Sequence, residues 1–288
     1  MASESFLEPG EDRIRMLYVA SQGHSGSTLL AQLLGRHSAV VSTGEIANLD
    51  NLEQKCTCNA PTIPECKFWQ RVDEILARRG SRSIRELDIR GTDPSRFHED
   101  NVALFAAVRE ASGASVIVDS SKVIDRLSAL NKIPELDITP IYLRRHPAGV
   151  VNSNVRKGRN WLTYTLRHYG PSRERVEYFR KLDHVKVNYT ELVATPEKVL
   201  TNVMRAVGLS FEQDQLLWAE GERHDVGGNR MRFSDDSKIL LDDRWQRDLS
   251  PFKKLVINSL LSDRMIESDL VAKTSRIVKP IFGPNRAS

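Results

Sequence analysis

Short runs of β-branched and aliphatic residues alternate along this chain with stretches that have helical spacing. The runs predicted as strands cover residues 16–20, 116–118, 138–143 and 185–187. After each run, apolar residues recur at the spacing of one helix face, as Leu30 and Leu34 do after the first. This alternation is typical of βα units on a parallel sheet that is buried on both faces. The pattern therefore predicts an α/β fold with a mostly parallel central sheet.

Two longer segments, 46–112 and 156–181, interrupt the alternation. Each is longer than a direct connection between neighbouring elements needs. No stretch rich in Pro, Ser or Gly divides the chain, so we expect a single domain over residues 1–288 in which both segments are insertions on the substrate side. Residues 1–13 are expected to form a flexible tail.

Composition narrows the class of protein. Hydrophobic residues make up 40 % of the 288 positions and charged residues 28 %, which excludes a disordered chain, a collagen-like repeat and a small disulfide scaffold. The net charge of +4 suits an anionic ligand better than a long polyanion, although a slightly basic surface explains it equally well. No segment approaches the ~20 apolar residues of a membrane span, and the N-terminus has no apolar stretch typical of a signal peptide. We expect a cytoplasmic protein with no membrane span.

The three cysteines, Cys56, Cys58 and Cys66, all lie in one short stretch. An odd number of cysteines so close together excludes a disulfide framework for the whole fold. A zinc site lacks a fitting fourth ligand, since His98 is distant in the sequence. A local disulfide is a second alternative. Free thiols are the favoured interpretation, and we expect no metal.

The first predicted strand leads directly into a loop with two glycines, Gly23 and Gly26, and then into a helix. This order of elements places backbone N–H groups and the positive end of the helix dipole around an anion. Ser25, Ser27 and Thr28 add hydroxyl donors. The alternative is an ordinary Ser or Thr cap after a tight turn. Only two residues separate the glycines and no Lys follows them, so this loop differs from the Walker A loop.

The loop resembles the 5′-phosphosulfate loop of bacterial-type sulfotransferases that depend on 3′-phosphoadenosine 5′-phosphosulfate (PAPS). The residues that carry the resemblance are Gly23, His24, Ser25, Gly26, Ser27, Thr28 and Leu29. It implies a P-loop-NTPase-like three-layer α/β/α fold with helical and loop insertions, in which these residues bind PAPS. His24 stands where the family usually has Lys or Arg, a catalytic position. Only a protonated imidazole supplies the same charge.

A second motif follows the third predicted strand. Arg145 and Ser153 have the spacing of the family's 3′-phosphate motif, and the resemblance implies that both bind that phosphate. An Arg at the carboxyl end of a strand offers several donors where open α/β sheets bind ligands. The alternative is an Arg that caps a carbonyl and a Ser on a solvated helix face.

Two further segments resemble the family. Tyr189 lies in a segment similar to the one with an adenine-contacting Tyr, although a core Tyr is an open alternative. Residues 227–233 resemble the closing segment of bacterial sulfotransferases. By this resemblance, Asn229 and Arg232 are the polar contacts to the 3′-phosphate.

Transfer of a sulfuryl group by in-line displacement needs charge stabilisation and a base for the acceptor hydroxyl. Glu45 lies in a Gly-Glu pair that resembles the element with the family's acidic base, and a capping or substrate-orienting carboxylate is the alternative. Lys122 ends the second predicted strand and either stabilises the transferring group or pairs with Asp119. His168 is a further base candidate, for which a solvated surface His is the favoured interpretation.

Together these motifs predict an enzyme that transfers the sulfuryl group of PAPS to a hydroxyl or amine of a small-molecule or carbohydrate acceptor. Adenosine 3′,5′-bisphosphate would be the product, and no metal would be required. The alternatives are a metal-dependent nucleotide or sugar kinase and a non-catalytic module that binds adenosine bisphosphate or an RNA end. Basic and aromatic residues in 156–181 suit a lid over an anionic cofactor. No nucleic-acid motif accompanies them, so no nucleic-acid partner is expected.

Overall fold

The computed structural model describes residues 12–268. The chain divides into two compact units, Met1–Arg145 with Asp183–Leu241 and His146–Leu182 with Asp242–Ser288. The single domain predicted over residues 1–288 stays a prediction. Most of the tail predicted at residues 1–13 lies outside the described residues.

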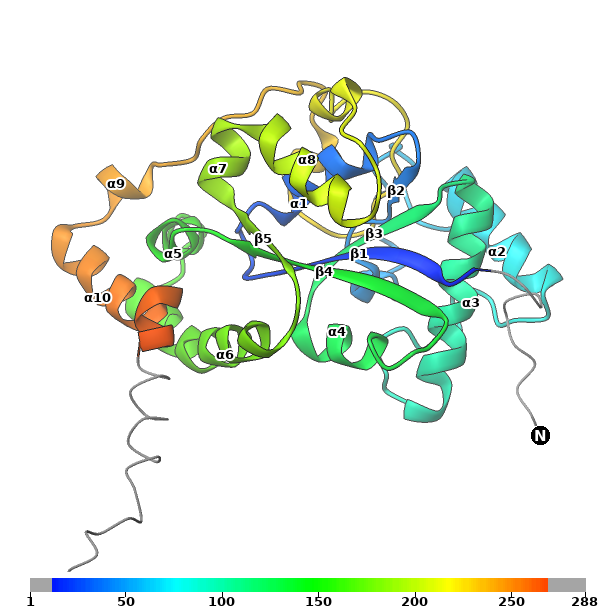
Figure 1. Ribbon diagram of the computed structural model, residues 1–288, viewed down its shortest axis with the longest axis horizontal. Helices are drawn as coiled ribbons and strands as arrows, with labels where there is room; N and C mark the ends of the chain where they lie inside the picture. The colour runs from blue at the N-terminus through cyan, green and yellow to red at the C-terminus, as the bar shows by residue number, and fades with distance from the viewer. Residues whose placement is uncertain (1–11, 269–288) are drawn as a thin grey trace, which may run out of the picture. The chain divides into compact units, whose positions relative to one another are not determined.

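The first unit is built on a parallel sheet in the order β2-β3-β1-β4-β5 (Figure 1). Its strands are β1 (Ile14–Ser21), β2 (Val40–Ser42), β3 (Val116–Lys122), β4 (Leu136–Arg144) and β5 (Val185–Asn188). All four predicted strands are present, and the α/β prediction with a parallel central sheet is confirmed. Only the three-residue β2 was not predicted, because so short an apolar run has no recognisable period.

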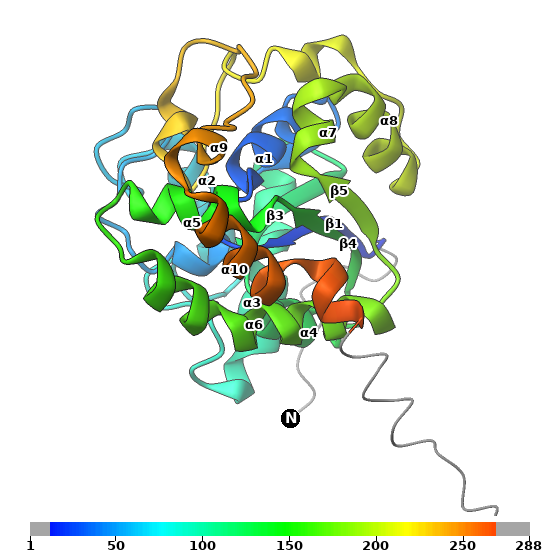
Figure 2. The same ribbon diagram turned by 90° about the vertical axis from the view of Figure 1, so that its left-hand side faces the viewer.

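Helices cover both faces of this sheet. In Figures 1 and 2, α1 (Ser27–Gly35), α7 (Tyr189–Ala194) and α8 (Pro196–Ala206) lie on one face, and α3 (Pro94–Ser112) and α4 (Ile124–Leu130) lie on the other. The central strand β1 is buried on both faces, as a strand in the middle layer must be. Helix α3, one of the covering helices, comes from the segment 46–112 that was predicted as an insertion, and α2 (Lys67–Arg78) packs against it.

The register of the sheet changes where β1 approaches its carboxyl end. Tyr18 pairs with Asp119 of β3, but Ala20 pairs with Lys122, so β3 carries one extra residue there. Lys122 has a φ of 71°, a left-handed conformation that residues other than glycine rarely adopt. Bulges of this kind redirect side chains at the ends of strands. The irregularity lies directly before the loop predicted to bind phosphate.

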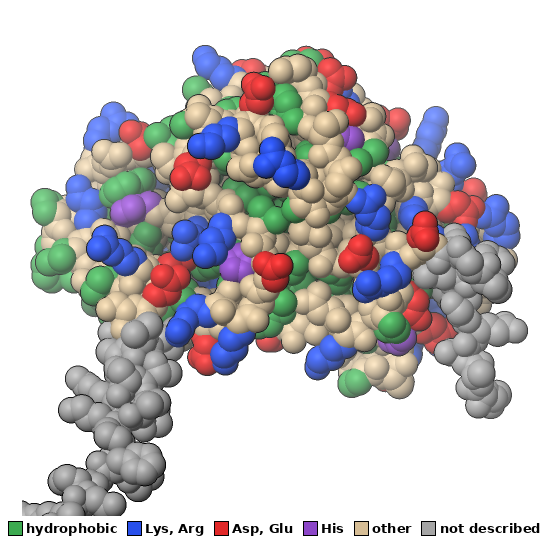
Figure 3. All heavy atoms as spheres, in the orientation of Figure 1, with side chains coloured by type: hydrophobic (Ala, Val, Ile, Leu, Met, Phe, Trp, Pro, Cys, Tyr) green, Lys and Arg blue, Asp and Glu red, His purple; other side chains and the backbone are tan. Residues whose placement is uncertain are grey.

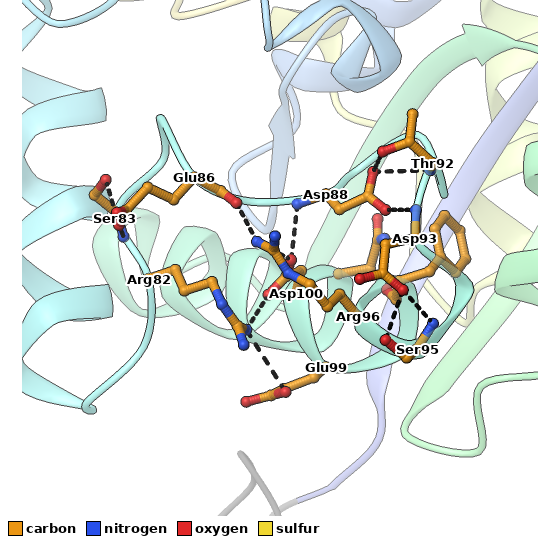
Figure 4. Close-up of polar contacts among 12 residues, drawn as sticks. Arg82, Ser83, Glu86, Asp88, Thr92, Asp93, Ser95, Arg96, Glu99 and Asp100 are labelled. Atoms are coloured by element: carbon orange, nitrogen blue, oxygen red, sulfur yellow. Dashed lines mark hydrogen bonds and ion pairs between the residues drawn. The ribbon is translucent and has the colours of Figure 1, made fainter.

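A polar network organises the approach to α3 (Figure 4). The Asp88 carboxylate accepts hydrogen bonds from the backbone N–H groups of Gly91, Thr92 and Asp93, and from the Thr92 hydroxyl. Asp93 then caps α3 by accepting from the N–H of Ser95 at 3.0 Å. Burial opposes ionisation of Asp88, but these hydrogen bonds outweigh it and hold its pKa below the usual value.

The second unit is helical. It contains α5 (Pro147–Val155), α6 (Trp161–Lys181), α9 (Trp245–Asp248) and α10 (Pro251–Leu261). Its buried core is formed by Ala148, Val150, Val151, Tyr164, Leu249, Ile257 and Leu261. The predicted insertion 156–181 is therefore mostly the long helix α6, which begins where the Asn160 side chain caps its first turn. Within residues 12–268, no helix has the length and apolar character needed to cross a bilayer.

Candidate active site

The loop between β1 and α1 has the backbone geometry of an anion-binding turn. Gly26 is the N-cap residue of α1 and adopts a left-handed conformation with a φ of 98°. Because Gly26 has no side chain, α1 lacks the Ser or Thr cap that was the alternative interpretation of this loop. The N–H groups at the start of a helix need acceptors from outside the helix. All residues from Gly23 to Leu29 lie in this loop and the first turn of α1.

Tyr189 and Arg145 pack against this loop. A Cβ placed on Gly26 would lie 2.5 Å from Cδ2 of Tyr189, so the ring lies directly against the glycine. The guanidinium of Arg145 lies over the same ring, 4.5 Å from its centroid. Arg145 Nη1 also donates to the carbonyl oxygen of His24 at 2.9 Å. Arg145 follows β4 directly, so the sheet brings two residues predicted from separate motifs onto the loop.

His24 has a strained backbone. Its φ of 66° is in the left-handed region, and its carbonyl is the one that Arg145 binds. A residue with a Cβ persists in this conformation only when its surroundings hold it there. The half-buried His24 is thus placed within the loop by contacts of the backbone rather than by local preference.

Glu45 and Lys122 form an ion pair in which both side chains are largely buried, with exposed fractions of 14 % and 18 %. The second carboxylate oxygen of Glu45 accepts from Asn48 Nδ2 at 2.9 Å. The structure therefore pairs Lys122 with Glu45. Asp119, the alternative partner weighed from the sequence, lies beside Arg126 at 3.4 Å.

Residues 226–229 join this ion pair to the phosphate loop. The Glu45 N–H donates to the carbonyl of Val226 at 2.6 Å, and the Asn229 N–H donates to the hydroxyl of Thr28 at 3.0 Å. A Cβ on Gly228 would lie 3.2 Å from Thr28 Oγ1 and 3.6 Å from Glu45 Oε1. The hydroxyl of the loop and the carboxylate of the ion pair thus both lie close to one glycine.

Buried Asp225 holds this segment in place. Its carboxylate accepts from Gln32 of α1 at 2.5 Å and from the Ser42 hydroxyl at the end of β2. Burial raises the pKa of Asp225, although both donors favour the charged form. Asp225 was not predicted as a site residue, because it follows Glu222, Arg223 and His224 in a run typical of a solvated loop.

The remaining predicted cofactor residues have other contacts. The Asn229 side chain accepts from the N–H of Met231, and the backbone N–H of Asn229 donates to Thr28 of the loop. Arg232 is buried and donates to the carbonyl of Lys55 at 2.9 Å, and burial lowers the pKa of its guanidinium. Ser153 belongs to the second unit, where its hydroxyl donates to the carbonyl of Gly149. The 3′-phosphate roles of these residues stay predictions.

His168 lies in α6 of the second unit, with its ring 4.1 Å from that of Tyr164. Burial lowers the pKa of this imidazole, and the nearby cations Arg175, Arg167 and Arg159 lower it further. It is half-buried rather than fully solvated. The lowered pKa favours the neutral form of the His168 imidazole.

Solved structures with a similar fold are sulfotransferases. The sulfotransferase domain from the curacin biosynthetic pathway has a TM-score of 0.57 at 18 % identity, covering 88 % of this chain and 99 % of its own. The sulfotransferase domain from the Synechococcus PCC 7002 olefin synthase has a TM-score of 0.50 at 18 % identity, covering 93 % and 98 %. Mouse sulfotransferase SULT7A1 complexed with PAP has a TM-score of 0.50 at 13 % identity, covering 93 % and 90 %. The predicted P-loop-NTPase-like three-layer fold is confirmed.

Comparisons at the level of sequence complete this evidence. No curated protein matches the chain. The family model described as "Sulfotransferase family" matches residues 17–213, well over half of the chain. The matched region runs from β1 to η2 (Gln213–Leu216) and so includes the loop, the Glu45–Lys122 pair and Arg145. The chain therefore belongs to the sulfotransferase family.

Proposed function

We propose that the protein transfers the sulfuryl group of PAPS to a hydroxyl or amine of a small-molecule or carbohydrate acceptor. One observation carries the proposal. The Glu45–Lys122 ion pair lies beside the glycine-containing loop, with Gly228 against both Glu45 and Thr28. A site for an anionic donor and a carboxylate able to accept a proton are thereby neighbours, as transfer to a hydroxyl requires.

The residues of the loop fit the phosphosulfate end of such a donor. A Cβ on Gly23 would meet nothing within 4 Å, so the backbone there is open to a ligand. Ser25, Ser27 and Thr28 supply hydroxyls, and the N-terminus of α1 supplies N–H groups. When bound, PAPS would supply the activated sulfuryl group. The structure of mouse sulfotransferase SULT7A1, which is complexed with PAP, supports a donor of this type.

Lys122 and His24 supply positive charge or donors beside the loop, and Glu45 takes the proton of the acceptor. Lys122 lies on one oxygen of Glu45 and Asn48 on the other, so an acceptor hydroxyl competes with Asn48 for Oε2. A backbone hydrogen bond to Val226 holds Glu45 at this position. The position of the proposed base therefore depends on Val226, a residue far along the chain from Glu45.

Arg145 and Tyr189 are proposed to contact the nucleotide part of the donor. Both already lie on the loop in the first unit, with the guanidinium above the ring. Arg suits phosphate because its planar group donates several hydrogen bonds at once. Ser153, Asn229 and Arg232 are retained as candidate 3′-phosphate residues on the family resemblance. The cytoplasmic location stays a prediction.

The kinase and the non-catalytic module remain as outcomes of the test. Over the face shown in Figure 3, Lys and Arg side chains are interspersed with acidic ones rather than gathered in one stripe, which favours a compact anion over a long nucleic acid. Calorimetric titration with adenosine 3′,5′-bisphosphate, AMP and ATP, with and without Mg²⁺, distinguishes a PAPS-type donor from ATP. Metal-independent binding of the bisphosphate with little binding of AMP supports the proposal. Binding of ATP only with Mg²⁺ overturns it.

Glu45→Gln tests the catalytic assignment. The amide cannot accept a proton, so we expect turnover with PAPS and an acceptor to fall by about 100-fold or more, the usual contribution of a general base. Affinity for the bisphosphate should change little. The control is Glu53→Gln, an exposed glutamate on the same segment. Equal turnover of both variants would refute Glu45 as the base, while bound bisphosphate without any turnover in the wild type would favour the binding module.

A further inference from the structure

The three cysteines lie close in space to a histidine from a distant part of the chain. Cys56, Cys58, Cys66 and His224 each offer a ligand atom, and all four atoms lie within 4.8 Å of one another. The Sγ of Cys66 is 3.6 Å from that of Cys56 and 3.5 Å from that of Cys58. The Nδ1 of His224 lies 3.2 Å from the same sulfur. The sequence placed three thiols together without a fourth ligand, and in the fold His224 supplies that ligand.

The three separations from Cys66 are close to the edges of a coordination tetrahedron, and no pair of the four atoms is more than 4.8 Å apart. With metal–sulfur bonds of about 2.3 Å and a metal–nitrogen bond of about 2.0–2.1 Å, tetrahedral zinc separates two sulfurs by about 3.8 Å and a sulfur from a nitrogen by about 3.5 Å. The sulfurs are also too far apart for a disulfide, which requires about 2.05 Å. The cluster is thus shaped for a metal ion.

The imidazole of His224 is oriented for ligation through Nδ1. Its other nitrogen, Nε2, faces the carboxylate of Glu222 at 3.4 Å. The ring of Phe68 stacks on the imidazole at 4.7 Å between centroids, and Trp69 Nε1 donates to the His224 carbonyl at 2.9 Å. Histidines that bind metals usually have such a partner on the second nitrogen, which fixes the tautomer and the ring.

The charge around the cluster also suits a bound metal. A divalent ion with three thiolates and one neutral imidazole carries one net negative charge. The buried guanidinium of Arg232 lies beside the cluster, because it donates to the carbonyl of Lys55, the residue before Cys56, and its Nε and Nη1 have no hydrogen-bond partner among the described residues. Asp225 and Glu45 are also close enough to this guanidinium to interact with it electrostatically. A nearby cation offsets the excess negative charge of the site.

We propose that Cys56, Cys58, Cys66 and His224 form a structural zinc site. Four protein ligands complete a tetrahedron and leave no open position, as in structural rather than catalytic zinc sites. Three sulfurs with one imidazole favour zinc over the harder divalent cations. This assignment concerns the folded chain itself and does not depend on the proposed transfer reaction.

The site would hold the segment that positions Glu45. Residues 54–58 and 224–227 already contact each other directly. The Asp225 N–H donates to the Thr57 hydroxyl at 2.6 Å, and the Gly227 N–H donates to Gln54 at 2.7 Å. Between these two bonds lies Val226, whose carbonyl binds the Glu45 N–H. Zinc at the cysteines would therefore stabilise the backbone contact on which the position of Glu45 depends.

Metal analysis of the full chain, purified without a polyhistidine tag or chelator, tests the proposal. We expect one zinc ion per chain by inductively coupled plasma mass spectrometry, retained on dialysis against a weak chelator. Replacement by Co²⁺ should give the charge-transfer and d–d absorption bands of a tetrahedral thiolate site. Fully reduced wild-type protein that contains no zinc, and takes up none on titration, would overturn the proposal. An intramolecular disulfide found by mass spectrometry in fresh protein, with no zinc uptake after reduction, would also overturn it.

Three variants test the assignment of His224 as a ligand. His224→Ala should lose the bound zinc, whereas His98→Ala, which changes an exposed histidine paired with Glu135, should keep it. Should His224→Ala fail to fold, Glu222→Gln leaves every ligand in place and is expected to weaken zinc affinity by about 10-fold. Full zinc content in a folded His224→Ala variant would remove His224 from the site. Because the readout is metal content, it is independent of whether the donor is PAPS.

Discussion

Gly26→Ala adds a methyl group at a position of the phosphate loop that has no room for one. The new Cβ would lie 2.5 Å from Cδ2 and 3.0 Å from Cε2 of Tyr189, in a residue whose φ is 98°. The ring cannot simply move away, because the guanidinium of Arg145 covers it and Tyr189 is only 7 % exposed. Both the backbone and the packing therefore oppose the substitution.

The two contributions have separate magnitudes. A residue with a Cβ in the left-handed region costs about 1–2 kcal/mol. Forcing an extra methyl group into filled space typically costs about 1–3 kcal/mol. Together they predict that Gly26→Ala lowers the free energy of unfolding by about 2–5 kcal/mol, a large part of the stability of an ordinary domain.

Urea unfolding followed by tryptophan fluorescence measures this loss, and Gly23→Ala is the matched control. Gly23 lies in the same loop, has no positive φ, and a Cβ there would meet nothing within 4 Å. In the double variant Gly26→Ala, Tyr189→Ala the loss of stability from packing should disappear, while the loss from the backbone conformation should remain. The packing contribution then appears as the coupling energy of a double-mutant cycle. Equal stability of Gly23→Ala and Gly26→Ala, within about 0.5 kcal/mol, would refute the reasoning.

Two further substitutions test the loop and the approach to α3. His24→Ala should lower turnover by about 30-fold or more, the order expected for one lost transition-state donor, with a modest loss of bisphosphate affinity; unchanged turnover in a steady-state assay would remove His24 from the mechanism. Asp88→Asn should cost about 1–2 kcal/mol at pH 7, because the amide accepts fewer N–H bonds than the carboxylate (Figure 4). The folded pKa of Asp88 is lowered, so its contribution is present above the unfolded pKa and is lost as pH falls through the folded value. The difference in urea midpoint between wild type and variant should therefore be largest at pH 7 and narrow as the pH falls below the ordinary aspartate pKa, whereas the exposed Asp183→Asn should match the wild type in urea midpoint at pH 7.

The parts of the fold that were predicted correctly are those with a local signal. Buried parallel strands have continuous apolar runs, and the helices that follow them have a regular period, so the βα units were visible in the sequence. The phosphate loop was visible for the same reason, since its glycines lie between a predicted strand and a predicted helix. The bulge that gives Lys122 its positive φ had no such signal, because it arises from pairing between β1 and β3.

The parts of the site that were missed depend on contacts between distant segments. Asp225 and His224 stand in a charged run, yet one is buried against α1 and β2 and the other lies among the cysteines. Nothing local distinguishes them from solvated residues, because their burial is created by the return of the chain to the carboxyl edge of the sheet.

The return of the chain to this edge also explains why Gly227 and Gly228 are glycines. A Cβ on Gly227 would lie 2.9 Å from the Cβ of Glu45, and one on Gly228 would crowd Thr28. The closing segment is therefore part of the site because its two glycines let the backbone lie directly against the candidate base and the phosphate loop.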